Sequence, residues 1–377
     1  MQEEGTPQKT PKKYIWIIVI LALVILILIR ALLFKSRPNS ANNARGDGSR
    51  PISSPSGSQQ SSSEEQNCSA DSVKFTKEFT DWDKIDAFQP LGSITGASRG
   101  RSYIGIKKGQ EVPVYAPADA TLVSVIYAYR GPDSDHGEYG FRFRVGCGVS
   151  ILLDHLDSAS DEMKKYAPAE PARSTANNDT LSIPVKAGTL LGYTNGTSMA
   201  RTFDFLVMDQ NRKAKYINPA RWQWDQSLYS VCPYDFYPND LKTKYYQKIG
   251  EPTDSGFIKA DDCGNPSYDI DNTISGGWFL DDQATDTHGQ FMLIGYRLNS
   301  VDVTIKSESE NSILRVTNYQ PKVLPKDVGI GESVCYSGFS NDWVYLSLID
   351  AKTIEVQNGS GSCPTSKPTT TATKYYR

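Results

Sequence analysis

The pattern of apolar and polar residues at the start of the chain predicts a membrane anchor. After a polar stretch, residues 1–13, an apolar run extends from Tyr14 to Phe34 with Arg30 as its one charge. A helix of about 21 residues is roughly 31 Å long, which is enough to cross the apolar core of a bilayer, and an arginine near its end can reach the headgroups. A cleaved signal peptide needs a shorter apolar region and a nearby small-residue cleavage site, and no convincing site follows. We therefore expect an uncleaved, single-pass signal anchor.

The next segment, residues 35–67, has no apolar periodicity. It is rich in Ser, Asn, Gly, Pro and Gln, and includes the run SSPSGSQQSSS. Such a composition cannot bury a core, so it predicts a flexible tether. The part of the chain beyond the tether is large and holds all six cysteines. We therefore expect this part to lie outside the cytoplasm.

Beyond the tether, short apolar runs separated by turn residues predict a mainly β fold. In the region 68–250 the strand patterns include Phe141–Leu153, where FRFRV alternates before the apolar run VSILL. The region 251–363 predicts a second, smaller antiparallel β domain. Its closely spaced strand patterns are Gln290–Leu298, Val301–Ile305, Ser312–Val316, Ser333–Tyr336, Val344–Leu348 and Thr353–Val356. Residues 364–377 are rich in Thr and predict a flexible tail.

Charge and motif content exclude several functions. Lys and Arg total 40 against 43 Asp and Glu, for a net charge of -3 in 377 residues. Proteins that bind nucleic acid usually show a basic face or tail, so no nucleic-acid partner is expected. The 3 His are too few for a His-rich zinc site. The chain has no nucleotide-binding loop and no G-x-S-x-G elbow, and we expect no cofactor.

The six cysteines predict disulfides outside the membrane. None forms the C-x-x-C pair of zinc knuckles or thioredoxin-like sites. The spacing does not fix the full set of pairings. We expect Cys335 to pair with Cys363, because the two flank one hairpin-like segment. Cys147 lies in an apolar strand pattern and is either paired or a free buried thiol.

Four short motifs follow one another in the region 91–209. They are V-Y-A-P at Val114–Pro117, His155-Leu156, V-K-A-G at Val185–Gly188 and F-D-F at Phe203–Phe205. Their order resembles the lysostaphin/LytM-type zinc peptidoglycan endopeptidases over about a third of the chain. The resemblance implies a duplicated-hybrid-motif fold, a LytM-like β-barrel sandwich, for the domain at 68–250.

The same resemblance implies that the family's metal site is degenerate in this chain. The family holds zinc with the His and Asp of an H-x-x-x-D motif and with the second His of an H-x-H motif. The segment Ser98–Lys107 holds neither His nor Asp, Asp204 stands where the ligand His would be, and Thr202 stands where the catalytic His would be. Only His155 matches a family histidine. A hydrolytic zinc site normally has three protein ligands and an open position, so the resemblance implies the fold without the peptidase activity.

Other polar residues are weaker candidates for chemistry. Ser150, Asp154 and His155 lie in one strand pattern, but a regular strand points His155 to the face opposite Asp154, which counts against a local triad. His136 lies in the loop G-P-D-S-D-H-G, where it could bind a metal with Asp133 and Asp135, although a solvated turn is the simpler interpretation. The aromatic residues between 222 and 237 either stack on sugar rings or form a packing layer between domains.

The sequence as a whole predicts a membrane-anchored cell-envelope protein with a binding or regulatory module for cell-wall glycan, wall peptide or a partner protein. The residues expected to contact the ligand are Arg101, Tyr103, His155, Thr202 and Asp204, and Arg101 could pair with a ligand carboxylate. One alternative is a divergent zinc metallopeptidase acting on peptidoglycan, and the other is a purely structural surface protein. The metallopeptidase would use His155 and Asp204 with Asp154 or His136, so clustering of these ligands would favour it. An open groove lined by Arg or aromatic residues would favour the binding module, and a groove filled by apolar side chains would favour the spacer.

Overall fold

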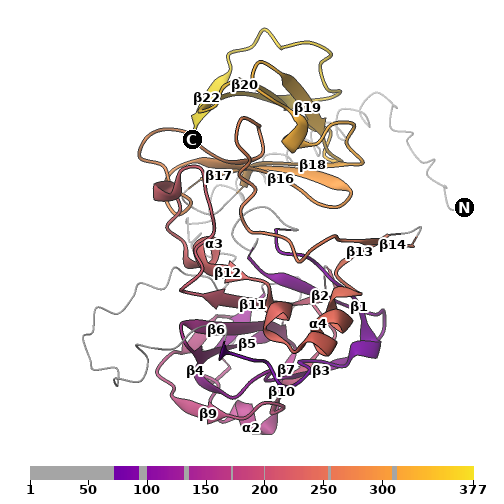
Figure 1. Ribbon diagram of the computed structural model, residues 1–377, viewed down its shortest axis with the longest axis vertical. Helices are drawn as coiled ribbons and strands as arrows, with labels where there is room; N and C mark the ends of the chain where they lie inside the picture. The colour runs from indigo at the N-terminus through magenta and orange to yellow at the C-terminus, as the bar shows by residue number, and fades with distance from the viewer. Residues whose placement is uncertain are drawn as a thin grey trace, which may run out of the picture. The chain divides into compact units, whose positions relative to one another are not determined.

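The computed structural model of the protein describes residues 72–92, 100–130, 136–170, 173–198, 200–253, 256–307 and 312–377. Strands dominate these ranges, as the sequence predicts (Figure 1). The expected anchor Tyr14–Phe34 and the expected tether 35–67 lie outside the described residues. Within the described ranges, no helix is long and apolar enough to span a bilayer.

The N-terminal part of the described chain forms a large antiparallel sheet and a small one. The large sheet has the order β1-β2-β11-β6-β5-β4-β8, while β12 pairs with β11 and β9 pairs with β4. Its strands are β1 (Ile85–Phe88), β2 (Ser102–Ile106), β4 (Ala120–Tyr129), β5 (Gly137–Gly146), β6 (Val149–Leu156), β8 (Ala176–Asn178), β9 (Ile183–Val185), β11 (Thr202–Asp209) and β12 (Ser230–Val231). The small sheet has the order β3-β10-β7, with β3 (Val112–Tyr115), β7 (Ser158–Ala159) and β10 (Leu190–Thr194).

Short helices connect and extend these sheets. The α-helices are α2 (Asp161–Lys164), α3 (Asp225–Tyr229) and α4 (Asn239–Tyr246), and the 3-10 helices are η3 (Trp82–Lys84), η4 (Pro219–Arg221), η5 (Pro233–Phe236) and η6 (Pro325–Asp327). Ser160 caps α2, because its Oγ accepts a hydrogen bond of 3.3 Å from the backbone N–H of Met163. Met163 is fully buried, so this short helix is held by its cap and by one apolar anchor.

One face of the large sheet is the main apolar core. Side chains alternate between the two faces of a strand, so Phe141 and Phe143 of β5, Leu153 of β6 and Phe203 and Phe205 of β11 all point to the same side. All five are fully buried or nearly so, in one cluster. The opposite face carries a smaller apolar cluster of Ile126, Ala128, Leu152 and Leu206. The polar residues described below share this second face.

The stretch Phe141–Leu153 is a hairpin of β5 and β6, which corrects the expectation of one continuous strand. The turn lies at Cys147 and Gly148, whose φ angles are 53° and 74°. Glycine adopts this left-handed conformation at little cost, and the G-C-G triplet supplied a turn signal that the apolar pattern concealed.

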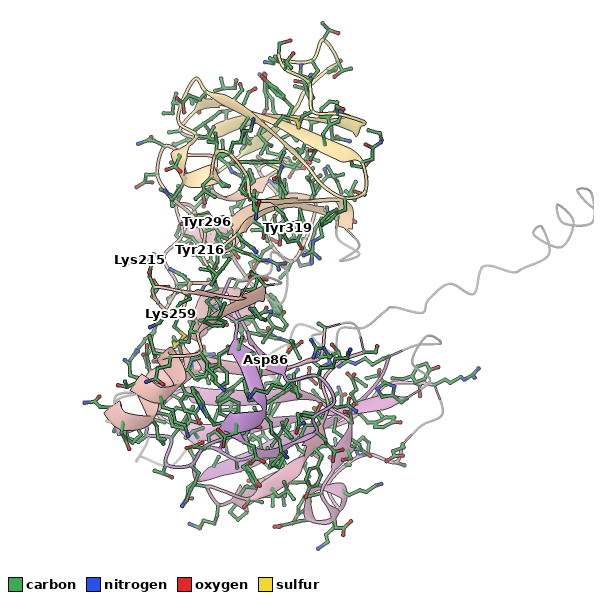
Figure 2. All side chains as sticks on the ribbon, turned by 90° about the vertical axis from the view of Figure 1, so that its right-hand side faces the viewer. Asp86, Lys215, Tyr216, Lys259, Tyr296 and Tyr319 are labelled. Atoms are coloured by element: carbon green, nitrogen blue, oxygen red, sulfur yellow. A yellow bond between two sulfur atoms is a disulfide. The ribbon has the colours of Figure 1, made fainter. Side chains whose placement is uncertain are left out.

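The C-terminal part forms a nearly closed, barrel-like antiparallel sheet with the order β18-β17-β16-β15-β22-β21-β20-β19. Its strands are β15 (Gly276–Phe279), β16 (Phe291–Tyr296), β17 (Ser300–Lys306), β18 (Ser312–Tyr319), β19 (Ser333–Ser337), β20 (Asp342–Asp350), β21 (Thr353–Ser360) and β22 (Thr373–Tyr376). A separate hairpin joins β13 (Gly250–Thr253) to β14 (Gly256–Lys259). The sheet encloses Trp278, which is fully buried. At the end of β18, the ring of Tyr319 (Figure 2) lies 5.2 Å from that of Phe339, which is 90% exposed.

The end of the chain is ordered into this sheet, so the expectation of a flexible tail is wrong for Thr373–Tyr376. These residues form β22, which pairs with β21 and with β15. Tyr375 is buried, and the Arg377 guanidinium stacks on the ring of Trp278 at 4.0 Å. The Thr-rich composition hid a four-residue strand whose stability comes from tertiary pairing.

The cysteines are paired. The expected Cys335–Cys363 disulfide is confirmed, and a second bridge joins Cys232 to Cys263. Cys147 is also disulfide-bonded, so the alternative of a free buried thiol is wrong. The described part of the chain therefore holds no free cysteine.

Candidate functional site

Two aspartates lie side by side on the second face of the large sheet. β11 pairs with β6 so that Asp204 stands directly opposite Asp154. Both side chains are almost fully buried, and like charges at directly opposite strand positions repel each other. Arg101 supplies the compensating charge, because its Nη1 lies 2.7 Å from Asp204 Oδ2 and 3.4 Å from Asp154 Oδ2.

A β-bulge brings His155 to these aspartates. The β5–β6 register pairs Phe141 with Leu153 and Tyr139 with Leu156, so Asp154 and His155 together stand opposite one residue. His155 has a φ of 67°, in the left-handed region. Its backbone N–H donates to Asp154 Oδ1 at 3.0 Å, and its Nε2 lies 3.4 Å from Asp204 Oδ2. The expectation that His155 points away from Asp154 is therefore wrong, because it assumed a regular strand.

The residue opposite the bulge is Gly140, and a side chain does not fit there. A Cβ at Gly140 would lie 2.7 Å from Asp154 Oδ1, well inside the contact distance that real Cβ atoms keep. Glycine at this position therefore makes the room in which the Asp154 carboxylate sits.

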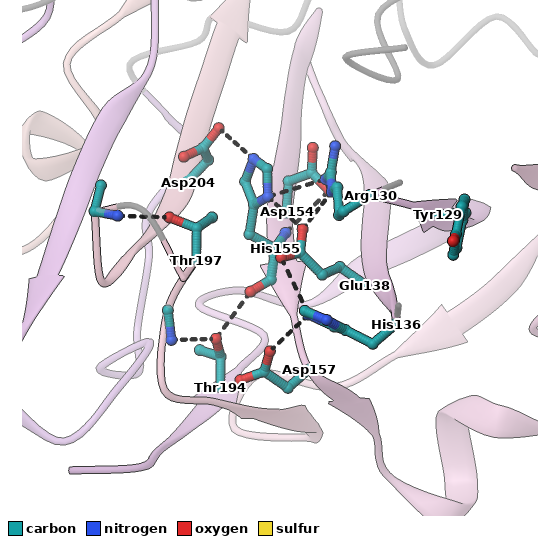
Figure 3. Close-up of polar contacts among 12 residues, drawn as sticks. Tyr129, Arg130, His136, Glu138, Asp154, His155, Asp157, Thr194, Thr197 and Asp204 are labelled. Carbon is teal, nitrogen blue, oxygen red and sulfur yellow. Dashed lines mark hydrogen bonds and ion pairs between the residues drawn. The ribbon is translucent and has the colours of Figure 1, made fainter. Parts of the chain in front are cut away.

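Glu138 and Arg130 complete the group (Figure 3). His155 Nδ1 lies 2.6 Å from Glu138 Oε2, and Arg130 Nε pairs with the same oxygen. Arg130 Nη2 is 3.9 Å from Asp154 Oδ1. Arg130 Nη2 also lies 2.9 Å from Nδ1, but the Glu138 carboxylate is closer and is an acceptor only, so we place a proton on Nδ1. We call this group the inner cluster; its members are Arg101, Arg130, Glu138, Asp154, His155 and Asp204.

The inner cluster is balanced in charge at neutral pH. Burial opposes the charging of His155, but the carboxylates of Asp204 and Asp154 outweigh it and raise the pKa of His155 to about 10. Burial likewise opposes the charge on Asp204, but His155 and Arg101 lower the pKa of Asp204 to about 2. Burial also disfavours the charge on Glu138, and His155 and Arg130 still hold its pKa below the usual range. Three carboxylates thus face two arginines and an imidazolium.

Asp154, His155 and Asp204 meet the clustering criterion that the metallopeptidase alternative requires. Their ligand atoms lie within 4.8 Å of one another. However, Arg101 Nη1 contacts one oxygen of each aspartate, and the Arg101 side chain is 1% exposed. A divalent cation would have to displace this buried guanidinium from the oxygens that it needs. The residues present therefore do not fit a catalytic metal at this position.

A second group of possible ligands lies beside the inner cluster and shares Glu138 with it. His136 Nε2 lies 3.7 Å from Glu138 Oε1 and 3.8 Å from Asp157 Oδ1 (Figure 3). The other oxygen of Asp157 accepts a hydrogen bond of 2.7 Å from the backbone N–H of Asn195. Burial raises the pKa of Asp157. We call His136, Glu138 and Asp157 the outer cluster.

A cavity of about 170 Å³ lies on the same sheet face, next to the inner cluster. Leu152, Leu206 and Met208 line its sheet side, and Trp224 and Gln226 also line it. Gln226 connects the cavity to the inner cluster, because its Oε1 accepts a hydrogen bond of 3.4 Å from Arg101 Nε. The cavity therefore joins a largely apolar wall to a fixed polar network.

The residues expected to contact a ligand divide into two groups. Arg101, His155 and Asp204 are brought together in the inner cluster, whereas Tyr103 stands opposite Asp204 on β2 and Thr202 stands opposite Gly105. Arg101, Tyr103, Thr202 and Asp204 are all buried, so they do not line an open groove. His155 keeps 15% of its side chain exposed.

Sequence reasoning missed Glu138, Arg130 and Gln226 as members of the site. The usable signal was a single acidic residue in the segment G-E-Y-G-F, where an unpaired carboxylate would be costly to bury. Its partners are remote or lie across a bulge, so spacing alone did not reveal them.

The LytM-type resemblance rests on the order of four short motifs. The family relationship stays a prediction. Comparison with known proteins finds no matching family model, no matching curated protein and no matching solved structure.

Proposed function

We propose that this chain is a membrane-anchored cell-envelope protein whose LytM-like β domain does not hydrolyse peptidoglycan. In this proposal the domain is a binding or regulatory module for cell-wall glycan, wall peptide or a partner protein. The observation that carries it is the ion pair of 2.7 Å between Arg101 and Asp204. It places a permanent organic cation where a peptidase of this type would need an exchangeable metal.

The metallopeptidase alternative loses its reactive groups in this arrangement. A catalytic zinc needs an open coordination position for water. The carboxylate oxygens that would bind the metal are instead engaged by Arg101, and Asp204 is only 2% exposed. His155 is held as an imidazolium by Glu138 and the two aspartates, so it is a poor general base near neutral pH.

The cavity beside Gln226 favours a binding module over a spacer. A pure spacer gains nothing from a hollow face, because unfilled apolar space costs stability. The cavity has a largely apolar wall with Trp224 at its edge, and such a site suits one or two side chains of a peptide. A peptide ligand, from the wall or from a partner protein, therefore fits this site better than an extended glycan.

The test is sedimentation of the full chain, in mild detergent, with purified peptidoglycan, while released wall fragments are measured with and without added zinc. We expect co-sedimentation without fragment release. Trp224→Ala should weaken retention by about tenfold, as for an aromatic residue at a binding centre. Trp343→Ala is the matched control, because Trp343 is also half-buried and lies outside the cavity.

Two results would count against the proposal. Zinc-dependent release of fragments that Asp204→Asn abolishes would show a peptidase. Absence of co-sedimentation would remove the wall as the ligand.

A further inference from the structure

The outer cluster presents three different ligand atoms to one point in space. His136 Nε2, Glu138 Oε1 and Asp157 Oδ1 lie within 4.8 Å of one another. None of the three belongs to the motif positions used for the family resemblance. The outer cluster uses Glu138 Oε1 and lies beside the inner metal position, so a site here does not rest on the proposed function.

Glu138 is the member that points to a ligand. Its side chain is 3% exposed, and its Oε2 is taken by His155 and Arg130. Its Oε1 faces His136 Nε2 at 3.7 Å, which is beyond hydrogen-bonding distance. The second oxygen of this buried side chain is thus directed at the His136 imidazole at ion-pair distance, and a cation between the two atoms would contact both.

Hydrogen bonds with neighbouring backbone groups hold the other two members, Asp157 and His136, in place. Asp157 Oδ2 is fixed by the Asn195 backbone N–H at 2.7 Å, which leaves Oδ1 directed toward His136. His136 immediately precedes β5, and its backbone carbonyl accepts a hydrogen bond of 3.3 Å from the N–H of Arg130. Such contacts from neighbouring groups are what orient metal ligands in proteins.

Two of the three ligand separations require only a small closure around an ion, and the third is within 4.8 Å. Ligands bound tetrahedrally to zinc at 2.0–2.2 Å are about 3.3–3.6 Å apart. The observed separations are 3.7 Å and 3.8 Å. His136 is 40% exposed and Asp157 is 25% exposed, so both side chains have room to move by a few tenths of an ångström.

We propose that His136, Glu138 and Asp157 form a binding site for one divalent transition metal, for which zinc is the matching ion. One imidazole nitrogen and two carboxylate oxygens suit zinc better than magnesium or calcium, which prefer oxygen alone. Three protein ligands leave a fourth position in a tetrahedral zinc site. This position takes water or an oxygen atom of a bound molecule.

The test is calorimetric titration of zinc into the full chain in detergent, purified without a polyhistidine tag and stripped with a chelator. We expect about one zinc per chain, and binding at least about tenfold weaker after His136→Ala or Asp157→Asn. His288→Ala is the matched control, because His288 lies in a loop outside the outer cluster. Magnesium and calcium should not compete at equal concentration.

A second readout separates loss of a ligand from loss of the fold. Cobalt in place of zinc should give a visible absorption band that disappears in His136→Ala, while the far-ultraviolet circular dichroism stays unchanged. Zinc binding that is unaffected by His136→Ala, or absent from the parent chain, would overturn the inference. Zinc binding that depends on Asp204 and not on His136 would overturn both this metal site and the proposed function. Loss of wall binding alone would overturn the proposed function and leave the metal site standing.

Discussion

Arg101 Nη1 lies 2.7 Å from Asp204 Oδ2, and the two side chains are 1% and 2% exposed. A pair this deeply buried is tolerated only while both charges are present, because taking a charge out of water costs several kcal/mol for each ion. The same guanidinium reaches Asp154 and Gln226, so one side chain supports two strands and the wall of the cavity. Substitutions at Arg101 should therefore change both the stability of the domain and its affinity for metal ions.

Removal of the Arg101 charge should destabilise the domain strongly. Arg101→Met leaves two buried aspartates without their main counter-charge, and we expect a loss of about 3–5 kcal/mol in the free energy of unfolding. Arg101→Met combined with Asp204→Leu should lose much less. Urea unfolding followed by tryptophan fluorescence measures both. Lys186→Met is the control, because the Lys186–Asp119 pair is exposed and should contribute little to stability.

Removal of Arg101 should also uncover a latent metal position. Arg101→Ala leaves three carboxylates against Arg130 and His155, and the ligand atoms of Asp154, His155 and Asp204 are already close together. We expect Arg101→Ala to bind one more zinc per chain than the parent, as measured by elemental analysis after dialysis. The added zinc should be lost in Arg101→Ala/Asp204→Asn. Equal zinc content in the parent and in a folded Arg101→Ala chain would contradict the interpretation of Arg101 as a substitute cation.

A methyl group at Gly140 should disturb the Asp154 carboxylate. Gly140→Ala places a Cβ 2.7 Å from Asp154 Oδ1, and overpacking of this kind typically costs about 1–3 kcal/mol. Gly105→Ala on β2 is the control, because its Cβ would meet its nearest neighbour at 3.5 Å. Thermal unfolding of the two variants side by side gives the comparison. Equal stability of the two would mean that the bulge relaxes without cost.

The His155 imidazolium should make the stability of the domain depend on pH. Its folded pKa of about 10 lies above the ordinary histidine pKa of about 6.5, so the stabilisation is complete below about 6.5 and disappears as pH rises through 10. The difference in unfolding free energy between the parent and His155→Gln should therefore shrink steadily over that window. Urea midpoints measured with a chelator present test this. A difference that stays constant across the window would show that His155 is neutral in the folded state.

The Cys335–Cys363 disulfide should stabilise the C-terminal sheet mainly through the unfolded chain. The two residues are 28 positions apart, and closing a loop of that size is worth about 3.6 kcal/mol. We expect Cys335→Ser/Cys363→Ser to unfold at lower temperature by scanning calorimetry. His288→Ala, which leaves all disulfides intact, should unfold at the parent temperature.

The sequence by itself determined the mainly β character of the chain and one of its disulfides. Apolar alternation and turn residues are local properties, so the predicted strand Val301–Ile305 agrees with β17 to within one residue at each end. The β5–β6 hairpin was missed because the apolar run continues on both sides of its turn. β22 was missed because Thr373–Tyr376 has no apolar period of its own and is stable only through pairing with β21 and β15.

The tertiary structure alone decided the chemistry of the site. The motif comparison identified Arg101, His155 and Asp204 as candidate site residues. It did not predict that the arginine would neutralise the aspartates. Arg101 and Asp204 are 103 positions apart, and His155 reaches them only through a bulge. Strand register and ion pairing are fixed when the sheet forms, because only then do the cost of burying each charge and the gain from its partner come into balance.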